Sequence, residues 1–196
     1  MSAAARATAP RRGRKAAASR EDVIRAATRN YLRGQRVDVQ GIAADLGLGR
    51  STVYRWFGSR EELIGEVLVR VTERLLDEAR SEARGEGAAK LLDTFDRFNR
   101  ALVAAPALRT FVDRERGAAV RIITSGTGMV QRRNVAMITE AIEDEVRAGR
   151  YDPPVDPATL GYAIVRLAEA FIFNESATGL SDSVDRLREV EAALLR

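Results

Sequence analysis

The stretch that decides the fold covers residues 39–64 and reads VQGIAADLGLGRSTVYRWFGSREELI. In its first part, Ile42 and Leu46 stand four positions apart, which places them on one face of a short helix. Gly47 then interrupts this helix and permits the turn conformation that a β-carbon opposes. A second helix follows over residues 52–57. The stretch therefore predicts a helix-turn-helix.

Two further helices are predicted to flank this motif. Ser19 can cap a helix that ends near Leu32, because a serine hydroxyl accepts hydrogen bonds from the free amides of a first turn. Ser59 and Glu62 have the spacing of a capping box and begin a long helix. We therefore expect residues 19–65 to form a helix-turn-helix DNA-binding domain.

The rest of the chain shows only helical periodicity, and no alternating strand pattern of useful length occurs. Helices are predicted over residues 91–102, from Pro106 to a break at Gly117, and over residues 129–148, 157–177 and 181–196. We expect an all-α fold of about nine helices, in which a three-helix head precedes a helical-bundle body at residues 66–196.

The composition excludes most catalytic chemistry. The 196-residue chain has no cysteine and no histidine, so disulfide bonds, the usual zinc ligands and histidine-based nucleophilic triads are impossible. The acidic clusters Glu61–Glu62 and Glu143–Glu145 are interpreted as solvated faces or helix caps. We expect no enzyme activity, no metal site and no cofactor. No run of about 18 apolar residues occurs, which predicts a cytoplasmic protein without a membrane span.

The basic charge is concentrated at one end of the chain. Residues 1–60 hold 13 basic and 4 acidic residues, a balance of +9, whereas residues 61–196 hold 19 basic and 24 acidic residues, a balance of −5. This asymmetry predicts a polyanionic partner for the head alone, such as double-stranded DNA. Residues 1–18 are predicted to be a disordered basic arm, which either contacts DNA or is a solvated tail.

The deciding stretch resembles the DNA-binding signature of the TetR family of transcriptional regulators. That signature has an Ile-Ala pair, a glycine in the turn, and then Thr, a small apolar residue, Tyr, Phe, Ser or Asn, Lys and Leu at fixed offsets. The matching positions are Ile42, Ala43, Gly47, Thr52, Val53, Tyr54, Phe57, Ser59 and Leu63. Trp56 and Arg60 stand where the family most often has His and Lys. The resemblance covers about 45 residues and implies a dimeric regulator whose body binds a small ligand.

The second helix of the motif is predicted to lie in the major groove of DNA. Arg50 and Arg55 are the best candidates for base readout, because a guanidinium matches the two acceptors of guanine. Ser59 and Arg60 are predicted to hold a phosphate at the positive end of the next helix. The candidate DNA-binding residues are Arg50, Ser51, Thr52, Tyr54, Arg55, Trp56, Ser59 and Arg60.

The last two helices are predicted to form the interface of a homodimer. Residues 160–177 are apolar nearly all round, and a helix that is apolar on every face is buried on every face. The last helix adds Leu187, Val190 and Leu194 in helical register. One of these faces is expected to meet a second subunit. The alternative is simple burial inside a monomer.

The body also contains the residues for a small-molecule pocket, which needs apolar walls and few polar groups. The alternative is an ordinary core with polar edges, in which Arg166 and Glu169 form a structural ion pair. The candidate lining residues are Phe95, Phe98, Asn99, Leu102, Phe111, Ile122, Met129, Asn134, Met137, Ile138, Arg166, Glu169, Phe171 and Asn174.

The C-terminal half as a whole is similar to the QsdR-type subgroup of actinobacterial TetR regulators, which is linked to lactone-degrading pathways. This resemblance implies a small apolar effector that is lactone-like or acyl. We predict a transcriptional repressor that binds a palindromic operator as a dimer and is released by its effector. An effector-independent DNA-binding protein and a transcriptional activator of the same fold are the alternatives.

Overall fold

The computed structural model describes residues 18–126, 128–173 and 184–196, and this part of the chain contains nine α-helices and no strand. The predicted all-α fold is confirmed. Residues 1–17 of the predicted arm and the end of the predicted 157–177 helix lie outside the described residues. The helices are α1 (Arg20–Leu32), α2 (Val39–Asp45), α3 (Arg50–Phe57), α4 (Arg60–Glu82), α5 (Gly87–Ala104), α6 (Pro106–Thr124), α7 (Met129–Arg147), α8 (Pro157–Phe173) and α9 (Val184–Leu194).

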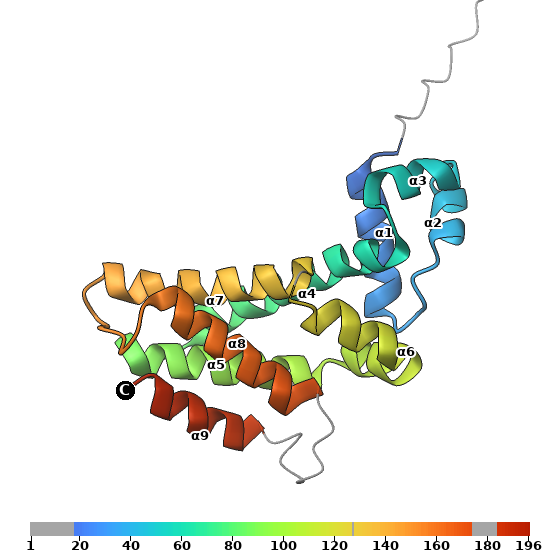
Figure 1. Cartoon of the computed structure of the whole chain (residues 1–196). Coiled ribbons are helices and arrows are strands. Elements are labelled where there is room, and N and C mark those ends of the chain that lie inside the picture. Colours follow the sequence, from blue (N-terminus) through green and yellow to red (C-terminus); the bar gives the residue numbers. More distant parts are fainter. Residues whose placement is uncertain (1–17, 127, 174–183) are drawn as a thin grey trace, which may run out of the picture.

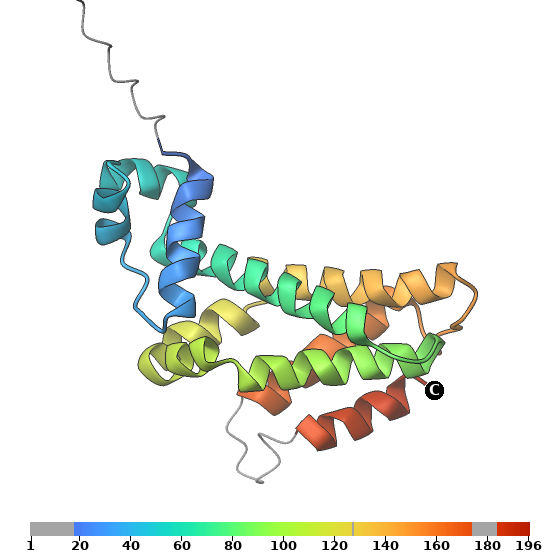
Figure 2. The same ribbon diagram turned by 180° about the vertical axis from the view of Figure 1, so that it is seen from behind.

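Figures 1 and 2 show a small head on an elongated body. The head consists of α1, α2 and α3, and the long helix α4 begins in the head and runs into the body. In the body, α7 packs against α4 and α8, while α9 packs against α5 and α8. Helix α6 lies at the junction, where it contacts both α1 and α4. None of the described helices is long and apolar enough to cross a membrane.

Helices α1 and α4 begin at the predicted capping residues, and α2 has a side-chain cap as well. Ser19 and Asp22 form a capping box at the start of α1, and Ser59 and Glu62 form another at the start of α4. The Asp38 carboxylate caps α2 by accepting hydrogen bonds from two amides of its first turn. These local contacts fix where the helices start, and therefore how α3 is presented.

Two hydrophobic cores lie along the molecule, and the first crosses the expected domain boundary at residue 65. It joins α1–α3 and the first half of α4 to α6 and the start of α7, with Phe111 and Ile123 buried in it. The second core lies in the body around Phe95 and Ile142. The head therefore shares its core with α6.

The predicted break at Gly117 is present, but it lies two residues earlier. Helix α6, from Pro106 to Thr124, consists of two helical stretches that meet in a kink at Glu115, whose φ of −135° and ψ of 42° are not helical. The kink occurs where the Glu115 carboxylate meets the Arg60 side chain of α4. A glycine lowers the stability of a helix, but it does not end one that is packed on both sides of it.

The interpretation of residues 143–145 as a solvated face is wrong for Glu145, which is buried. Its side chain is buried and accepts hydrogen bonds from Arg150 at 2.7 and 2.9 Å and from the Gly87 amide at 3.1 Å, and the Lys90 ammonium lies 3.2 Å away. The Arg150 hydrogen bonds outweigh the effect of burial and lower the pKa of Glu145 to about 2. This carboxylate therefore ties the end of α7 to the start of α5.

Candidate nucleic-acid interface and ligand cavities

The turn between α2 and α3 has the backbone that a helix-turn-helix requires. Gly47 has a φ of 66°, a value that glycine adopts without steric cost. The amides of Gly47 and Leu48 donate to the carbonyls of Ala44, at 3.0 Å, and Ala43, at 2.8 Å, which closes the end of α2. Ala43 and Val53 are buried where the two helices meet. This packing holds α3 at a fixed angle on the head.

Helix α3 presents its predicted DNA-contacting residues on the outside of the head. Arg50, Ser51 and Arg55 are exposed. The half-buried candidates at the edges of this face are Thr52, Tyr54 and Trp56. The Arg50 guanidinium lies 5.2 Å from the centre of the Tyr54 ring, a cation–π contact that leaves its N–H groups available. Arg50 and Arg55 have no carboxylate partner in the part of the chain that the structure describes.

The last two predicted phosphate contacts, Ser59 and Arg60, are engaged within the protein. The Ser59 hydroxyl accepts a hydrogen bond from the Glu62 amide at 3.0 Å. The Arg60 guanidinium donates to both oxygens of Glu115, at 2.6 and 2.7 Å, and to the Val37 carbonyl at 2.7 Å. Arg60 therefore joins α4 to α6 and to the loop before α2. Its contact with a DNA phosphate stays a prediction, and this arrangement does not support it because the guanidinium is already occupied.

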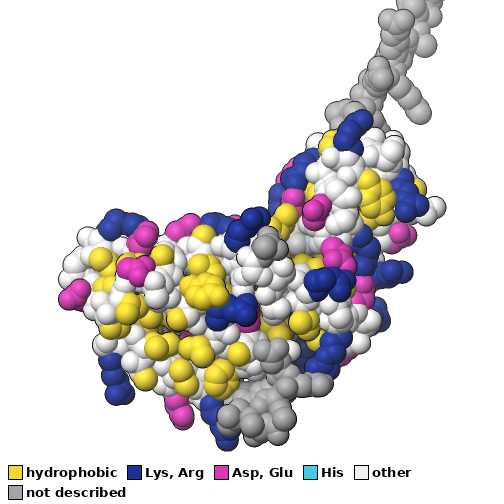
Figure 3. Space-filling model, viewed as in Figure 1, with side chains coloured by type: hydrophobic (Ala, Val, Ile, Leu, Met, Phe, Trp, Pro, Cys, Tyr) yellow, Lys and Arg dark blue, Asp and Glu magenta, His cyan; other side chains and the backbone are white. Residues whose placement is uncertain are grey.

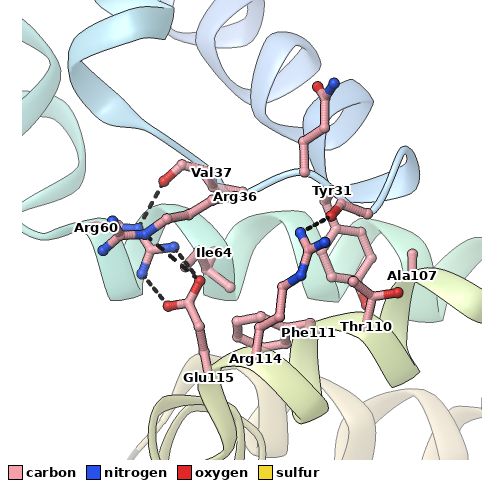
Figure 4. A pocket seen from close by; sticks show the side chains of 12 residues that line it. Tyr31, Arg36, Val37, Arg60, Ile64, Ala107, Thr110, Phe111, Arg114 and Glu115 are labelled. Carbon is pink, nitrogen blue, oxygen red and sulfur yellow. Dashed lines mark hydrogen bonds and ion pairs between the residues drawn. The ribbon is translucent and has the colours of Figure 1, made fainter.

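Figure 4 shows how α6 holds the base of the head. Arg114 donates to the Gly34 carbonyl at 2.7 Å, and Arg36 lies 3.9 Å from Glu115. The rings of Tyr31 and Phe111 meet edge to face, with centroids 6.1 Å apart. The head is thus fastened to α6 by polar and aromatic contacts on both sides of one small cavity.

A cavity of about 40 Å³ lies in the body between α5, α7, α8 and α9. Eight of the predicted pocket residues line it: Phe95, Phe98, Asn99, Leu102, Asn134, Met137, Ile138 and Glu169. The further lining residues are Ile123, Ile164, Val165, Ala168, Ile172, Phe173 and Glu191. The sequence thus identifies α5 and α7 as walls of the cavity but not α9.

The other predicted pocket residues that the structure describes do not line this cavity. Phe111 lies at the junction of head and body, and Ile122 and Met129 pack with the first core. Phe171 is half-buried on α8 outside the cavity, and Asn174 lies outside the described residues. Helix periodicity gave these residues an inward face, but it could not show which core they face.

Arg166 and Glu169 form the ion pair that the sequence allowed as an alternative to ligand binding. The Arg166 guanidinium is exposed and lies 2.8 Å from the buried Glu169 carboxylate. The Gln131 amide donates to both oxygens of Glu169, at 3.2 and 3.4 Å. Burial raises the pKa of Glu169, against the opposing effects of Arg166 and Gln131. Arg166 itself does not line the cavity.

Glu191 is the residue of this cavity that sequence reasoning missed. Its side chain is 0% exposed, and its Oε1 accepts a hydrogen bond from the Asn99 amide at 3.0 Å. Its Oε2 is buried and has no hydrogen-bond partner among the described residues. A signal was present in the sequence, because Glu191 stands between Leu187 and Leu195 at four-residue spacing on an apolar stripe.

A larger cavity of about 210 Å³ adjoins the first and shares Leu102, Ile123, Asn134 and Phe173 with it. Its described lining contains no charged side chain. The other lining residues are Tyr31, Leu32, Leu68, Val71, Thr72, Leu75, Ala105, Pro106, Ala107, Leu108 and Val130. The cavity therefore extends from the middle of the body to the end of α1 and the start of α6.

The body of the molecule matches a known protein family. Residues 86–196 match the family described as the tetracyclin repressor-like, C-terminal domain. The chain belongs to the TetR family of transcriptional regulators.

Solved structures of TetR-family repressors extend this likeness to the whole chain. The repressor QsdR from R. erythropolis is 30% identical, with a TM-score of 0.82, over 90% of this chain and 93% of that one. The repressor AlkX from Dietzia sp. strain DQ12-45-1b, implicated in biodegradation of n-alkanes, is 22% identical, with a TM-score of 0.62, over 91% and 95% of the two chains. That second likeness concerns the fold alone. No curated protein sequence matches the chain.

Trp56 and Arg60, the two residues of this TetR-family chain that depart from the usual signature, both contact other parts of the protein. Trp56 packs against the first core, and Arg60 faces Glu115.

The family and the structural neighbours are transcriptional regulators rather than enzymes. Among the described residues, no group of three or more His, Cys, Asp or Glu side chains is placed to hold a metal ion.

Proposed function

We propose that this chain is a repressor that binds a palindromic operator as a homodimer and leaves it when a small apolar effector, lactone-like or acyl, occupies the body. The outer face of α3 carries the proposal. Arg50 and Arg55 are exposed there with no carboxylate partner in the described residues, whereas body arginines such as Arg70 and Arg133 pair with glutamates. Unpaired guanidiniums on one helix face are a surface for an anion.

On DNA, α3 lies in the major groove, with Arg50 and Arg55 donating to guanine. The half-buried Tyr54 and Trp56 at its edges donate to phosphates, which fix the position of the helix without reading sequence. In a two-fold dimer, two such helices about 34–36 Å apart meet successive major grooves. The operator therefore has two inverted half-sites.

The homodimer forms through α8 and α9. Tyr162 of α8 is 53% exposed and Val190 of α9 is 36% exposed, although both are large apolar residues. Val155, just before α8, is 46% exposed. Figure 3 shows hydrophobic side chains gathered on this face of the body. Contiguous apolar surface of this kind is typical of a protein interface, and a second copy of the chain would cover it.

Release follows from the position of the larger cavity. Its lining includes Tyr31 at the end of α1 and Leu108 at the start of α6, so a ligand there contacts both the head and the helix that holds it. A ligand that binds better to a shifted position of α6 favours the state in which the two α3 helices no longer match the operator. An effector-independent DNA-binding protein does not need such cavities, so their presence disfavours that alternative.

A mobility-shift assay at fixed salt tests the proposal with DNA from upstream of the chain's own gene. We expect specific binding by the natural chain and a loss of at least tenfold in affinity for Arg50→Ala and for Arg55→Ala, since each guanidinium reads a base. Arg74→Ala is the matched control, because Arg74 is also an exposed arginine and lies on the body part of α4. Equal binding of operator and random duplex would contradict the proposed function.

A further inference from the structure

The two adjoining cavities of about 40 and 210 Å³ contain no basic side chain in their described lining, although the chain has 32 Lys and Arg residues. The charged groups of the smaller cavity are the carboxyls of Glu169 and Glu191. The larger cavity is lined by apolar residues together with Thr72, Asn134 and Tyr31. A site for a carboxylate or phosphate ligand needs a cation or several aligned N–H donors, and this lining does not provide a cation.

Glu191 lacks one hydrogen-bond partner at a buried position. Glu191 lines the smaller cavity; its Oε1 accepts the hydrogen bond from Asn99, whereas its Oε2 has no partner among the described residues. Leaving a buried polar atom unpaired costs free energy, so the arrangement is completed by a ligand atom that pairs with Oε2.

The surroundings of Glu191 favour its neutral form. Burial raises its pKa to about 8, the Asn99 hydrogen bond opposes this, and the negative charge of Asp96 on α5 adds to it. Arg188 on α9 opposes the rise but also lies 3.8 Å from Asp96, and Glu169 on α8 lines the same cavity. A protonated Glu191 carries a proton on one oxygen, so at neutral pH it is a hydrogen-bond donor.

Asn134 supplies a second donor between the two cavities. Its Oδ1 lies 3.2 Å from the Thr72 hydroxyl, which also contacts the Val69 carbonyl at 3.0 Å, and its amide N–H groups donate to none of the described residues. Asn134 lines both cavities. A ligand that passes from one cavity to the other therefore meets two donors, from Glu191 and Asn134, and needs acceptors to satisfy them.

We propose that the two cavities form one site for an uncharged amphiphile with a carbonyl head group and an alkyl chain, and that the neutral carboxylic acid of Glu191 recognises the carbonyl oxygen. The head group lies in the smaller cavity beside Glu191, and the chain extends through the larger apolar cavity toward Tyr31 and Leu108. The inference rests on the proposed function, because it defines the effector of that same body.

This site rejects ligands that differ only in the charge of the head group. A fatty-acid carboxylate would approach Glu169 and Glu191 without a cation to balance it, and burying an unpaired charge is costly. A hydrocarbon without a carbonyl leaves Glu191 Oε2 unpaired. A short lactone satisfies Glu191 but does not fill the larger cavity, so it buries little apolar surface.

Titration calorimetry of the purified full-length chain without DNA tests this proposal. The probes are γ-dodecalactone, laurate and dodecylamine, which share a chain length and differ in the charge of the head group, together with the short γ-butyrolactone. We expect γ-dodecalactone to bind at least tenfold more tightly than each of the other three. Tighter binding of laurate or dodecylamine than of the lactone would overturn the proposal.

Three variants locate the recognition at Glu191. Glu191→Gln keeps a neutral donor of the same shape and is expected to retain γ-dodecalactone binding within about threefold, whereas Glu191→Leu is expected to weaken it about tenfold. Glu189→Gln is the control, because Glu189 is exposed on the same helix. Affinity of the natural chain is expected to fall between pH 6 and pH 9, as the Glu191 carboxyl ionises, and Glu191→Gln is expected to show no such fall.

The outcomes separate this inference from the proposed function. If the chain binds its operator but no lactone, or if Glu191→Leu binds the lactone as the natural chain does, the ligand assignment is wrong and the repressor proposal stands. If the lactone binds as described but no specific DNA does, the ligand assignment stands and the repressor proposal is wrong. Melting curves of each variant confirm that it is folded before binding is measured.

Discussion

At the scale of single residues, Glu145 and Glu191 are both buried carboxyls, and their surroundings shift their pKa values in opposite directions. Glu145 lies against Arg150, Lys90 and the Gly87 amide, which stabilise its charge. Burial and the nearby negative Asp96 destabilise the charge of Glu191, and its one hydrogen bond, from the Asn99 amide, does not outweigh them. The first residue therefore acts as an anion within the structure, and the second is available as a neutral donor to a ligand.

Glu145→Gln is expected to lower the free energy of unfolding at neutral pH by about 2 kcal/mol, because Arg150 and Lys90, each about one-third exposed, lose the counter-charge of the buried Glu145 carboxylate. The pKa of Glu145 is lowered from 4.5 to about 2, so its stabilisation is present above pH 4.5 and is lost as the pH falls toward 2. Denaturant unfolding from pH 7 to pH 2.5 should therefore show the two proteins converging in acid.

The matched control is Glu143→Gln, which removes an exposed carboxylate 3.3 Å from Arg147 on the same helix. Its effect is expected to be below about 0.5 kcal/mol at every pH, because exposed ion pairs are screened by water. A constant difference between the natural chain and Glu145→Gln across this pH range would show that the carboxylate charge is not what stabilises the α5–α7 contact.

At the scale of elements, α6 connects the larger cavity to the head. Glu115→Gln is expected to loosen this connection, because Arg60 loses the charge of its partner at a site where both side chains are about one-fifth exposed. Hydrogen exchange is then expected to become about tenfold faster in residues 34–38 and in the first half of α6, and to stay unchanged in α8. The same measurement on Glu73→Gln, which breaks the α4–α7 pair with Arg133, is the control.

If hydrogen exchange in Glu115→Gln is no faster in residues 34–38 or in the first half of α6, the aromatic contact of Tyr31 with Phe111 holds α6 without help from the ion pair. The pair also has a defined pH response. Arg60 lowers the pKa of Glu115, so the stabilisation from this ion pair is fully present above the ordinary carboxyl pKa and is lost as the pH falls below it, toward the lowered pKa.

The elements differ in how far their sequence predicts them. Capping boxes and the glycine turn depend on residues two to four positions apart, so Ser19, Ser59 and Gly47 were assigned correctly from the sequence. The kink of α6 lies at Glu115, whose partner Arg60 is 55 residues away, so the glycine predicts the position of the break only to within two residues. Periodicity shows which face of a helix is inward but not which helix it meets.

The same limit applies to the candidate sites. The exposed positions of Arg50 and Arg55 follow from the motif, because a helix-turn-helix fixes one outer face of its second helix. The pairing of Asn99 with Glu191 joins residues 92 positions apart, and no local pattern predicts it. Only the isolated glutamate on an apolar stripe marked this position in advance.

At the scale of the whole molecule, the net charge is less informative than its distribution, because the +9 of residues 1–60 becomes +18 at the two heads of a dimer. Operator affinity is therefore expected to fall steeply with salt, by a slope of about −0.9 for each phosphate contact.

Residues 1–17 contribute Arg6, Arg11, Arg12, Arg14 and Lys15 to this charge. Deleting them should make the slope shallower by about 2–4, as one or two contacts per arm are lost. Replacing the five residues by glutamine in the full-length chain is the control for a change of length. If both altered chains keep the natural slope in a salt series of operator binding, the arm is a solvated tail and the DNA contacts belong to the helix-turn-helix alone.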